Sequence, residues 1–387
     1  MRFWGTINIV MKIQNITRFN FKADIIDIHV HSNNTVSPWK GGMFPRSLDE
    51  FVKQPLNINI DGEKQTDNIK TVLVSSIEGL TWEESIYDKP IHNIAPDRIE
   101  FLKDEKSANV SLLKKYEHDD TYKLLLICQP ATGSADTIRK LITKYPNKVA
   151  GLKFHPKECH LYADSNLYDE YLELAEEFNL PCLFHSEVTV DYVLNEEAES
   201  LNYADPECIY TLARRHPKVP IILGHTGLGG GIAHQKTIKI LENSIQNNDA
   251  NLYAEISWMD FYKGKVKEKP ENILKLLSML KENNALDRVM FGTDAPLGIY
   301  GEIKKYETTP KQCYESTIGT IKSAIKKEFP EDYKDITDKL FYKNAETLLA
   351  NRKIQKRKTI KDYIPHIIGG IAGILGVAFA IKKLIKK

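Results

Sequence analysis

The sequence predicts an α/β fold, a (β/α)8 barrel, because two patterns occur together along the chain. Eight short and nearly continuous apolar runs are typical of parallel strands that helices cover. Helical patterns separate several of these runs, and this alternation favours a barrel. An open, doubly wound sheet is the alternative. The eight runs are 24–30, 71–75, 123–129, 149–154, 180–185, 219–225, 252–256 and 288–292.

The predicted helices have recognisable starts and stops. A polar residue caps the helix at 136–145, which stops before Pro146, and Pro206 occupies the first position of another helix. Two long connections, 32–70 and 77–122, follow the first two predicted strands. We expect them to be loops that lie over the mouth of the barrel and shape a substrate pocket. Further helices are predicted at 166–178, 208–215, 271–280 and 333–349.

Composition limits the classes of protein to which the chain can belong. Its 387 residues are enough for one large barrel, and 42% hydrophobic and 27% charged residues are typical of a globular protein. A formal net charge of +1 argues against a nucleic-acid partner. Five widely spaced cysteines predict reduced thiols, not a disulfide framework. The N-terminus lacks the apolar core of a secretory signal, so we expect the barrel in the cytoplasm.

The chain divides into four parts by composition. We expect an N-terminal extension, a barrel domain, a basic linker and a hydrophobic C-terminal helix. These parts are residues 1–23, 24–350, 351–362 and 363–387.

The hydrophobic C-terminal segment predicts attachment to a membrane. Residues 363–381 carry no formal charge when His366 is neutral, and 19 residues fall within the roughly 17–25 that a transmembrane helix needs. Gly369 and Gly373 form a G-x-x-x-G step that can bring membrane helices close, and lysines on both sides would meet anionic headgroups. Spanning the bilayer and lying in its interface are both open. A helix packed on a protein surface is the alternative, and a homo-oligomer is left open.

Residues of the types that bind metals follow several predicted strands. His29 and His31 alternate on one strand, so their side chains share a face. His185, His225 and Asp294 end three other apolar runs. Because the carboxyl ends of barrel strands meet at one mouth, we expect these side chains to form one metal centre. Imidazole and carboxylate ligands suit Zn²⁺, with Fe²⁺ and Mn²⁺ as alternatives.

Six segments carry a resemblance to a known family. DIHVH, GLKFHP, LFHSE, HPKVPIILGHTG, RVMFGTDAP and FYKNAETLLA follow one another between residues 24 and 350. The chain resembles the metal-dependent amidohydrolase superfamily, most closely the amidohydrolase-related branch that includes aminocarboxymuconate-semialdehyde decarboxylase-like enzymes. The resemblance implies that His29, His31, His185 and Asp294 surround a first metal ion. It also implies that His225 is either a ligand in a binuclear site or a catalytic acid or base.

Lys153 decides between one metal ion and two. In binuclear members of the superfamily a lysine on the fourth strand is carbamylated and bridges the ions, and Lys153 ends the fourth predicted strand. Binding of a substrate anion and a structural ion pair are the alternatives. His155 shares a face with Lys153, and Glu187 shares a face with His185. We therefore expect Lys153, His155 and Glu187 to bind the substrate; for Glu187, orienting a ligand and simply facing solvent are the alternatives.

The leading functional hypothesis is a metal-dependent hydrolase of a small molecule with an amide, ester or lactone bond. Asp294 would accept a proton from metal-activated water and pass it to the leaving group, while His225 would polarise the reacting oxygen. A metal-dependent, non-oxidative decarboxylase is the second hypothesis. The alternative from another class is a membrane-tethered protein that binds a ligand in a metal pocket without turnover.

Overall fold

The computed structural model describes residues 24–32, 48–76, 104–188, 190–191, 196–197, 202–262, 265–295 and 309–354. Eight parallel strands form one continuous sheet, and seven parallel ladders join neighbouring strands, three of them with register shifts. In sheet order the strands are β1 (Asp24–Ser32), β3 (Glu63–Ser76), β4 (Tyr122–Cys128), β5 (Val149–Phe154), β6 (Cys182–Glu187), β9 (Ile221–Leu228), β10 (Leu252–Glu255) and β13 (Val289–Met290).

The sheet closes on itself between β1 and the segment that begins at β13. The backbone N–H of Ile28 donates to the Phe291 carbonyl at 3.1 Å, and that of His31 donates to the Ala295 carbonyl at 2.7 Å. Val30 and Ala295 also form an isolated parallel bridge. The predicted (β/α)8 barrel is therefore confirmed, and the open doubly wound sheet is excluded.

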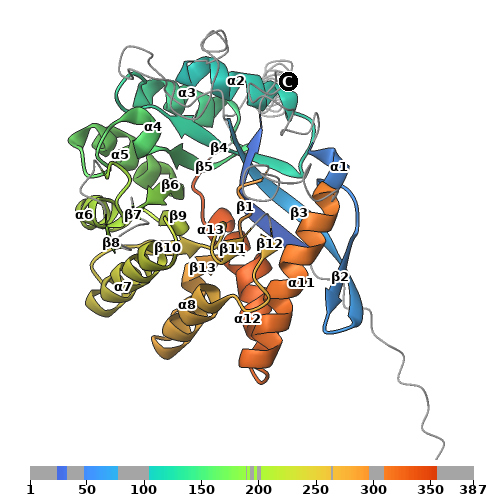
Figure 1. The fold of residues 1–387 in the computed structure, drawn as a ribbon. Coiled ribbons are helices and arrows are strands. Elements are labelled where there is room, and N and C mark those ends of the chain that lie inside the picture. The colour runs from blue at the N-terminus through green and yellow to red at the C-terminus, as the bar shows by residue number, and fades with distance from the viewer. Residues whose placement is uncertain are drawn as a thin grey trace, which may run out of the picture.

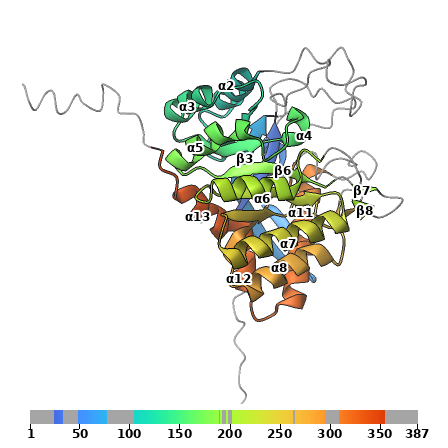
Figure 2. The same ribbon diagram turned by 90° about the vertical axis from the view of Figure 1, so that its left-hand side faces the viewer.

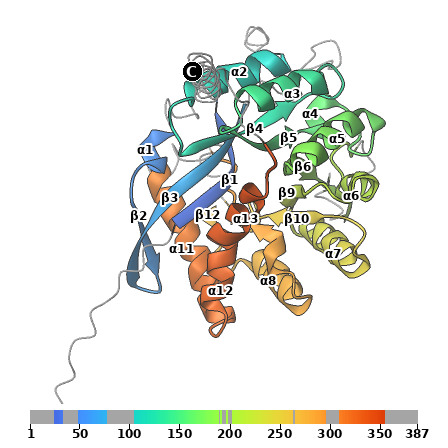
Figure 3. The same ribbon diagram turned by 180° about the vertical axis from the view of Figure 1, so that it is seen from behind.

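Helices surround the barrel on its outer side (Figures 1 and 3). One predicted helix start is confirmed: the Asp205 side chain accepts a hydrogen bond from Glu207 N at 2.8 Å, and Pro206 follows as the first helical residue. The cap predicted at residue 136 is wrong, because the helix begins at Ala135 after Ser134, whose side chain makes no capping hydrogen bond. The larger helices are α2 (Glu105–Lys115), α3 (Ala135–Lys144), α5 (Asp169–Phe178), α6 (Pro206–Arg215), α7 (Gly231–Asn247), α8 (Glu271–Glu282), α11 (Pro310–Glu328), α12 (Tyr333–Asp338) and α13 (Asn344–Ala350).

Shorter elements complete the described chain. The predicted helix at 333–349 contains a π-helical segment, Lys339–Lys343, between α12 and α13. The remaining short elements are α1 (Asp49–Val52), β2 (Leu56–Ile60), α4 (Pro156–Cys159), the 3-10 helices Asn166–Tyr168 and Leu286–Arg288, and the two-residue strands β7 (Val190–Asp191), β8 (Glu196–Glu197), β11 (Phe261–Tyr262) and β12 (Lys265–Val266).

Both connections that we expected to be loops contain regular structure. Within 32–70 lie α1, β2 and the first half of β3, and β2 pairs antiparallel with β3 as a hairpin. The turn is Asp61-Gly62, and both residues have positive φ, 51° and 89°. Within 77–122, the helix α2 occupies the last part. The loop prediction was therefore wrong for these parts. It relied on continuous apolar runs, whereas β2 alternates apolar and polar residues, as half-buried strands do.

The interior of the barrel is apolar at the end where the strands begin. Each of the eight strands contributes a side chain there, and α13 adds Ala345 and Leu348, which close this end. In Figure 2, α13 lies at one end of the barrel and β7 and β8 lie at the other. We call these the closed end and the open end. The inward-facing residues from the strands are Ile26, Ile28, Leu73, Leu125, Ala150, Leu183, Ile222, Tyr253 and Met290.

Two predictions made from composition concern the cysteines and the tail. The five cysteines all lie in the described residues and are reduced thiols, as predicted; Cys128, Cys182 and Cys313 are buried. Residues 1–23 and 355–387, which include the predicted membrane helix, lie outside the described residues. Among the helices that the structure describes, none has the length and apolar character needed to cross a membrane.

Candidate metal centre

The carboxyl ends of the barrel strands bring most of the predicted site residues into one buried cluster. His29 and His31 come from β1, Lys153 from β5, His225 from β9, and Asp294 from the segment after β13. Each of the five is at most 5% exposed. The ring centroid of His29 lies 5.2 Å from that of His31 and 5.0 Å from that of His225. Residues that are far apart in sequence thus lie together in one buried cluster.

The Nε2 atoms of two histidines converge on one carboxylate oxygen. Asp294 Oδ1 lies 3.2 Å from His29 Nε2 and 3.0 Å from His31 Nε2. Donor atoms bound to one ion at about 2.1 Å in a tetrahedron lie about 3.4 Å apart, so this spacing fits a metal such as zinc. The opposite ring nitrogens are occupied, because His29 Nδ1 lies 2.9 Å from Glu255 Oε2 and His31 Nδ1 lies 3.0 Å from Ser75 Oγ. These contacts fix the rings with Nε2 toward Asp294.

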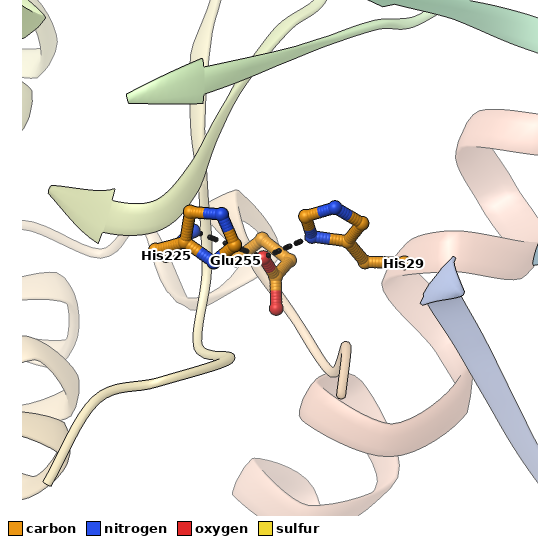
Figure 4. A group of neighbouring side chains, drawn as sticks. All are labelled: His29, His225 and Glu255. Carbon is orange, nitrogen blue, oxygen red and sulfur yellow. Dashed lines mark hydrogen bonds and ion pairs between the residues drawn. The ribbon is translucent and has the colours of Figure 1, made fainter. Parts of the chain in front are cut away.

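Glu255, the last residue of β10, links two of the histidines (Figure 4). Its carboxylate is fully buried, and Oε2 accepts hydrogen bonds from His225 N at 3.0 Å and Ser257 Oγ at 2.8 Å, besides its contact with His29. A Cβ atom at Gly292 would lie 2.4 Å from Glu255 Oε1, so the neighbouring strand needs a glycine there. His29, His225 and Glu255 form a second group of potential ligands. The hydrogen bonds favour an orienting role for Glu255.

His185 lies beside these two groups of ligand atoms and is a member of neither. Its Nδ1 lies 3.0 Å from His225 Nε2, and its Nε2 lies 3.0 Å from Glu187 Oε2. Glu187 also accepts a hydrogen bond from Lys157 Nζ at 2.6 Å. The His155 ring stacks on His185 with centroids 4.0 Å apart. The structure thus places His155, His185 and Glu187 together at the edge of the cluster.

The backbone is strained where two of the site residues follow their strands. His225 and Asp294 have φ values of 62° and 53°, and Thr226 has 44°. Each left-handed residue of this kind costs about 1–3 kcal/mol, so the surroundings must hold it in place. Asp294 N donates to the His29 carbonyl at 2.7 Å, and Thr226 Oγ1 donates to the Glu255 carbonyl at 2.8 Å. Strain of this kind is common at functional sites.

Burial favours the neutral imidazoles of His29 and His225, whereas neighbouring histidines keep the buried Asp294 carboxylate charged. Burial lowers the pKa of His29 and that of His225 well below the usual value of histidine. For Asp294, burial would raise the pKa, but the nearby His29 and the hydrogen-bonded His31 hold it well below its usual range. Neutral imidazoles beside an ionised carboxylate are the protonation states in which these groups bind a cation.

Lys153 is the basic residue that the structure places closest to this donor set. Its Nζ is buried and lies 3.0 Å from His29 Nε2. Burial lowers the pKa of the Lys153 ammonium to about 8, although the carboxylates of Asp294 and Glu255 oppose this shift. A lowered pKa makes the free amine more accessible, and the amine is the form that can react to give a carbamate.

A family model for amidohydrolases matches residues 117–350, which is more than half of the chain. The chain belongs to the amidohydrolase family. This family membership agrees with the resemblance seen in the sequence, and it makes the protein an enzyme of the amidohydrolase superfamily. Among curated proteins, the comparison finds no match.

Two solved structures illustrate the shared fold of this amidohydrolase. A putative amidohydrolase from Staphylococcus aureus is 14% identical, with a TM-score of 0.50, over 84% of this chain and 99% of that chain. A 2,6-dihydroxybenzoate decarboxylase in complex with 2,6-dihydroxybenzoate is 12% identical, with a TM-score of 0.50, over 85% of this chain and 99% of that chain. At these identities the likeness concerns the fold alone.

Sequence reasoning missed part of the amidohydrolase site. Glu255 is the penultimate residue of the predicted strand 252–256, and a buried carboxylate type so close to a strand end was the signal that could have identified it. Ser257 and Ser75 carried no such signal, because serines are frequent at strand ends. Trp258 donates a hydrogen bond from Nε1 to Asp294 Oδ2 at 2.6 Å. The indole therefore helps to orient the carboxylate, with Oδ1 toward the histidines.

Proposed function

We propose that this amidohydrolase is a metal-dependent hydrolase that cleaves an amide, ester or lactone bond in a small molecule. The single observation that carries the proposal is the convergence of His29 Nε2 and His31 Nε2 on Asp294 Oδ1. Such a buried set of two imidazoles and one carboxylate suits a divalent transition metal better than it suits a packed core.

Zn²⁺ is the proposed metal, with Fe²⁺ and Mn²⁺ as alternatives. His29, His31 and Asp294 would hold the ion, and His185 or His225 would complete its coordination. Asp294 Oδ1 already lies 3.2 Å from His29 Nε2 and 3.0 Å from His31 Nε2. When bound, a divalent ion lowers the pKa of a water molecule from about 15.7 toward 7.

Asp294 and His225 are the proposed catalytic residues. Asp294 Oδ2 accepts one hydrogen bond, from Trp258, and a carboxylate oxygen has capacity for a second one from the attacking water. His225 Nδ1 lies 2.7 Å from Ser257 Oγ, which holds the ring. We propose that Asp294 accepts the proton of the water and returns it to the leaving group, while His225 polarises the reacting oxygen of the substrate.

Lys153, His155 and Glu187 are the proposed substrate-binding residues at the edge of the site. Lys153 would bind an anionic group of the substrate or, as a carbamate, a second metal ion. Counting metal ions per chain in the purified protein and in Lys153→Met separates these roles. Two ions that fall to one in the variant support the carbamate, whereas one ion in both proteins supports anion binding.

The test of the function is a panel of esters, lactones and amides, assayed with metal-loaded protein and with metal-free protein after chelation. We expect hydrolysis that requires the metal and that His225→Ala abolishes. His216→Asn is the matched control, because His216 pairs with Asp169 on the outside of the barrel. Release of CO2 without hydrolysis would indicate a decarboxylase instead. Metal and ligand binding without any turnover would indicate the non-catalytic alternative and would refute our proposal.

We further propose that residues 363–381 attach the enzyme to a membrane and leave the barrel in the cytoplasm. The proposal rests on the length and apolar character of this segment and on the lysines at both of its ends. Deletion of residues 362–387 should move the protein from the membrane fraction to the soluble fraction and leave its metal content unchanged. Full-length protein that is soluble and monodisperse without detergent would refute the attachment.

A further inference from the structure

The described part of the chain ends at residue 354, at the closed end of the barrel. Residues that follow α13 cross the first residues of β5 and the last residue of α5. The Arg352 guanidinium donates a hydrogen bond to the carbonyl of Val149, the first residue of β5. Lys353 N donates to the carbonyl of Phe178, the last residue of α5, at a distance of 2.8 Å. Asn179 Nδ2 donates to the Asn351 carbonyl at 2.6 Å. The segment 351–354 is therefore fastened to the closed end by contacts from three consecutive residues.

The site and this exit point lie at opposite ends of the barrel. His225 and Asp294 belong to the carboxyl ends of the strands, whereas Val149 is the first residue of its strand. Between the two ends lies the apolar interior that Ala345 and Leu348 close. In Figure 2 the same separation is visible between α13 and the pair β7 and β8.

The linker is too short to reach around the barrel. From residue 354 to residue 363 there are nine residue steps, and nine fully extended steps cover at most about 32 Å. A compact domain of this length has a radius of gyration of about 20 Å, which corresponds to a sphere about 50 Å across. The open end therefore lies farther from residue 354 than the linker can extend.

We propose that the membrane-attached enzyme holds its closed end toward the bilayer and its open end toward the aqueous phase. The inference rests on the attachment proposed above. It assigns a substrate class to the site: a water-soluble small molecule that enters from solution, and not a lipid taken from the bilayer. Basic residues 356–358 and 361 precede the apolar segment, and they would bring the closed end close to anionic headgroups.

Two lysines make a matched pair of labelling sites for the test. Lys218 lies between α6 and β9 at the closed end, and Lys269 lies just before α8 at the open end. Their side chains are 78% and 79% exposed, so Lys218→Cys and Lys269→Cys disturb the fold equally little. Cys159→Ser and Cys208→Ser remove the two native cysteines that are partly exposed, and the other three are buried.

The experiment uses the full-length chain on vesicles of phosphatidylcholine and phosphatidylglycerol that carry a lipid-linked energy acceptor. We expect energy transfer from a dye at position 218 to be several-fold stronger than from the same dye at position 269. Insertion of about 20 Gly/Ser residues within 355–362, which adds up to about 66 Å of reach, should reduce this difference.

The outcomes separate the two proposals. If the protein does not sediment with the vesicles, the attachment is wrong and the orientation is wrong with it. If the protein sediments but energy transfer from a dye at position 269 is as strong as from position 218, the attachment holds and the orientation is refuted. If the difference in energy transfer between the two positions is the same with the longer linker, the short linker is not the cause of the orientation.

Discussion

The two ends of the barrel interior are built from the same eight strands and have opposite chemistry. At the closed end the inward positions are apolar, as at Ile26, Leu183 and Ile222. At the open end, inward positions carry ionisable groups such as Lys153 and Glu255, both fully buried. Burial of apolar side chains stabilises the fold, whereas burial of charged groups opposes it. The comparison indicates that the closed end supplies the stability that the open end requires for its chemistry.

The largest effect should follow from a change at the open end that leaves the closed end intact. Asp294→Asn removes the charge on which His29 Nε2 and His31 Nε2 converge. We expect a loss of activity of about 10²–10⁴-fold, together with loss of bound metal, because proton transfer at a positioned group contributes this much. The midpoint of thermal unfolding of the metal-free protein should change little. A metal-free variant that unfolds far below the metal-free wild type would contradict the separation of the two ends.

The converse change is Leu183→Ala at the closed end. Leu183 is fully buried, and its removal leaves a cavity in the barrel interior. We expect the free energy of unfolding to fall by about 2–5 kcal/mol, measured by denaturant titration. Metal content per folded chain should be unchanged. Tyr162→Ala is a control for truncation of an exposed side chain and should have a small effect.

A smaller effect is expected where a residue supports the metal ligands without binding the ion itself. Glu255→Gln keeps the shape of the side chain and removes the charge beside His29 Nδ1. We expect metal affinity to fall about 10–100-fold, as for other outer residues of this kind, with the number of ions per chain retained at saturating metal. Metal titration monitored by competition with a chelating dye measures this. If Glu255→Gln loses a whole ion at saturation, Glu255 is a ligand and its orienting role is wrong.

The smallest expected effect is on the pH dependence of the free energy of unfolding. Burial raises the pKa of Glu158, near the open end, to about 7, and Lys157 only partly opposes this shift. The folded protein thus keeps this proton up to about pH 7, while the unfolded chain releases it near its usual pKa of about 4.3. The contribution to stability is therefore largest at low pH and decreases as pH rises between these values. In Glu158→Gln, the difference in unfolding free energy between pH 5 and pH 7.5 should be smaller than in wild type.

An element of the fold could be predicted from the sequence only where the pattern of its residue types is distinctive. The strands were predictable because buried parallel strands are apolar throughout, and the run 149–154 coincides with β5. The hairpin of β2 and β3 was not predicted, because the prediction relied on continuous apolar runs, whereas Leu56, Ile58 and Ile60 alternate with exposed asparagines. The Asp61-Gly62 turn was the available signal, since two positive φ values favour this pair.

The candidate site, like the fold, could be predicted from the sequence only in part. His29, His31 and Asp294 could be predicted because ligand types at strand ends are unusual in apolar surroundings. The hydrogen bonds that orient them could not be predicted, because Ser75 and Ser257 come from strands whose register only the closed barrel defines. Whether His185 would bind the proposed ion or would only contact His225 likewise depends on distances of about an ångström. A sequence pattern does not encode such distances.

Closure of the barrel has a consequence for how the enzyme matures. His31 and Asp294 are brought together by backbone hydrogen bonds between β1 and residues 291–295. During synthesis the first of these residues leaves the ribosome more than 260 residues before the second. A nascent chain therefore cannot assemble the candidate metal centre until nearly the whole barrel has emerged, so an ion held by these residues would be loaded late in biogenesis.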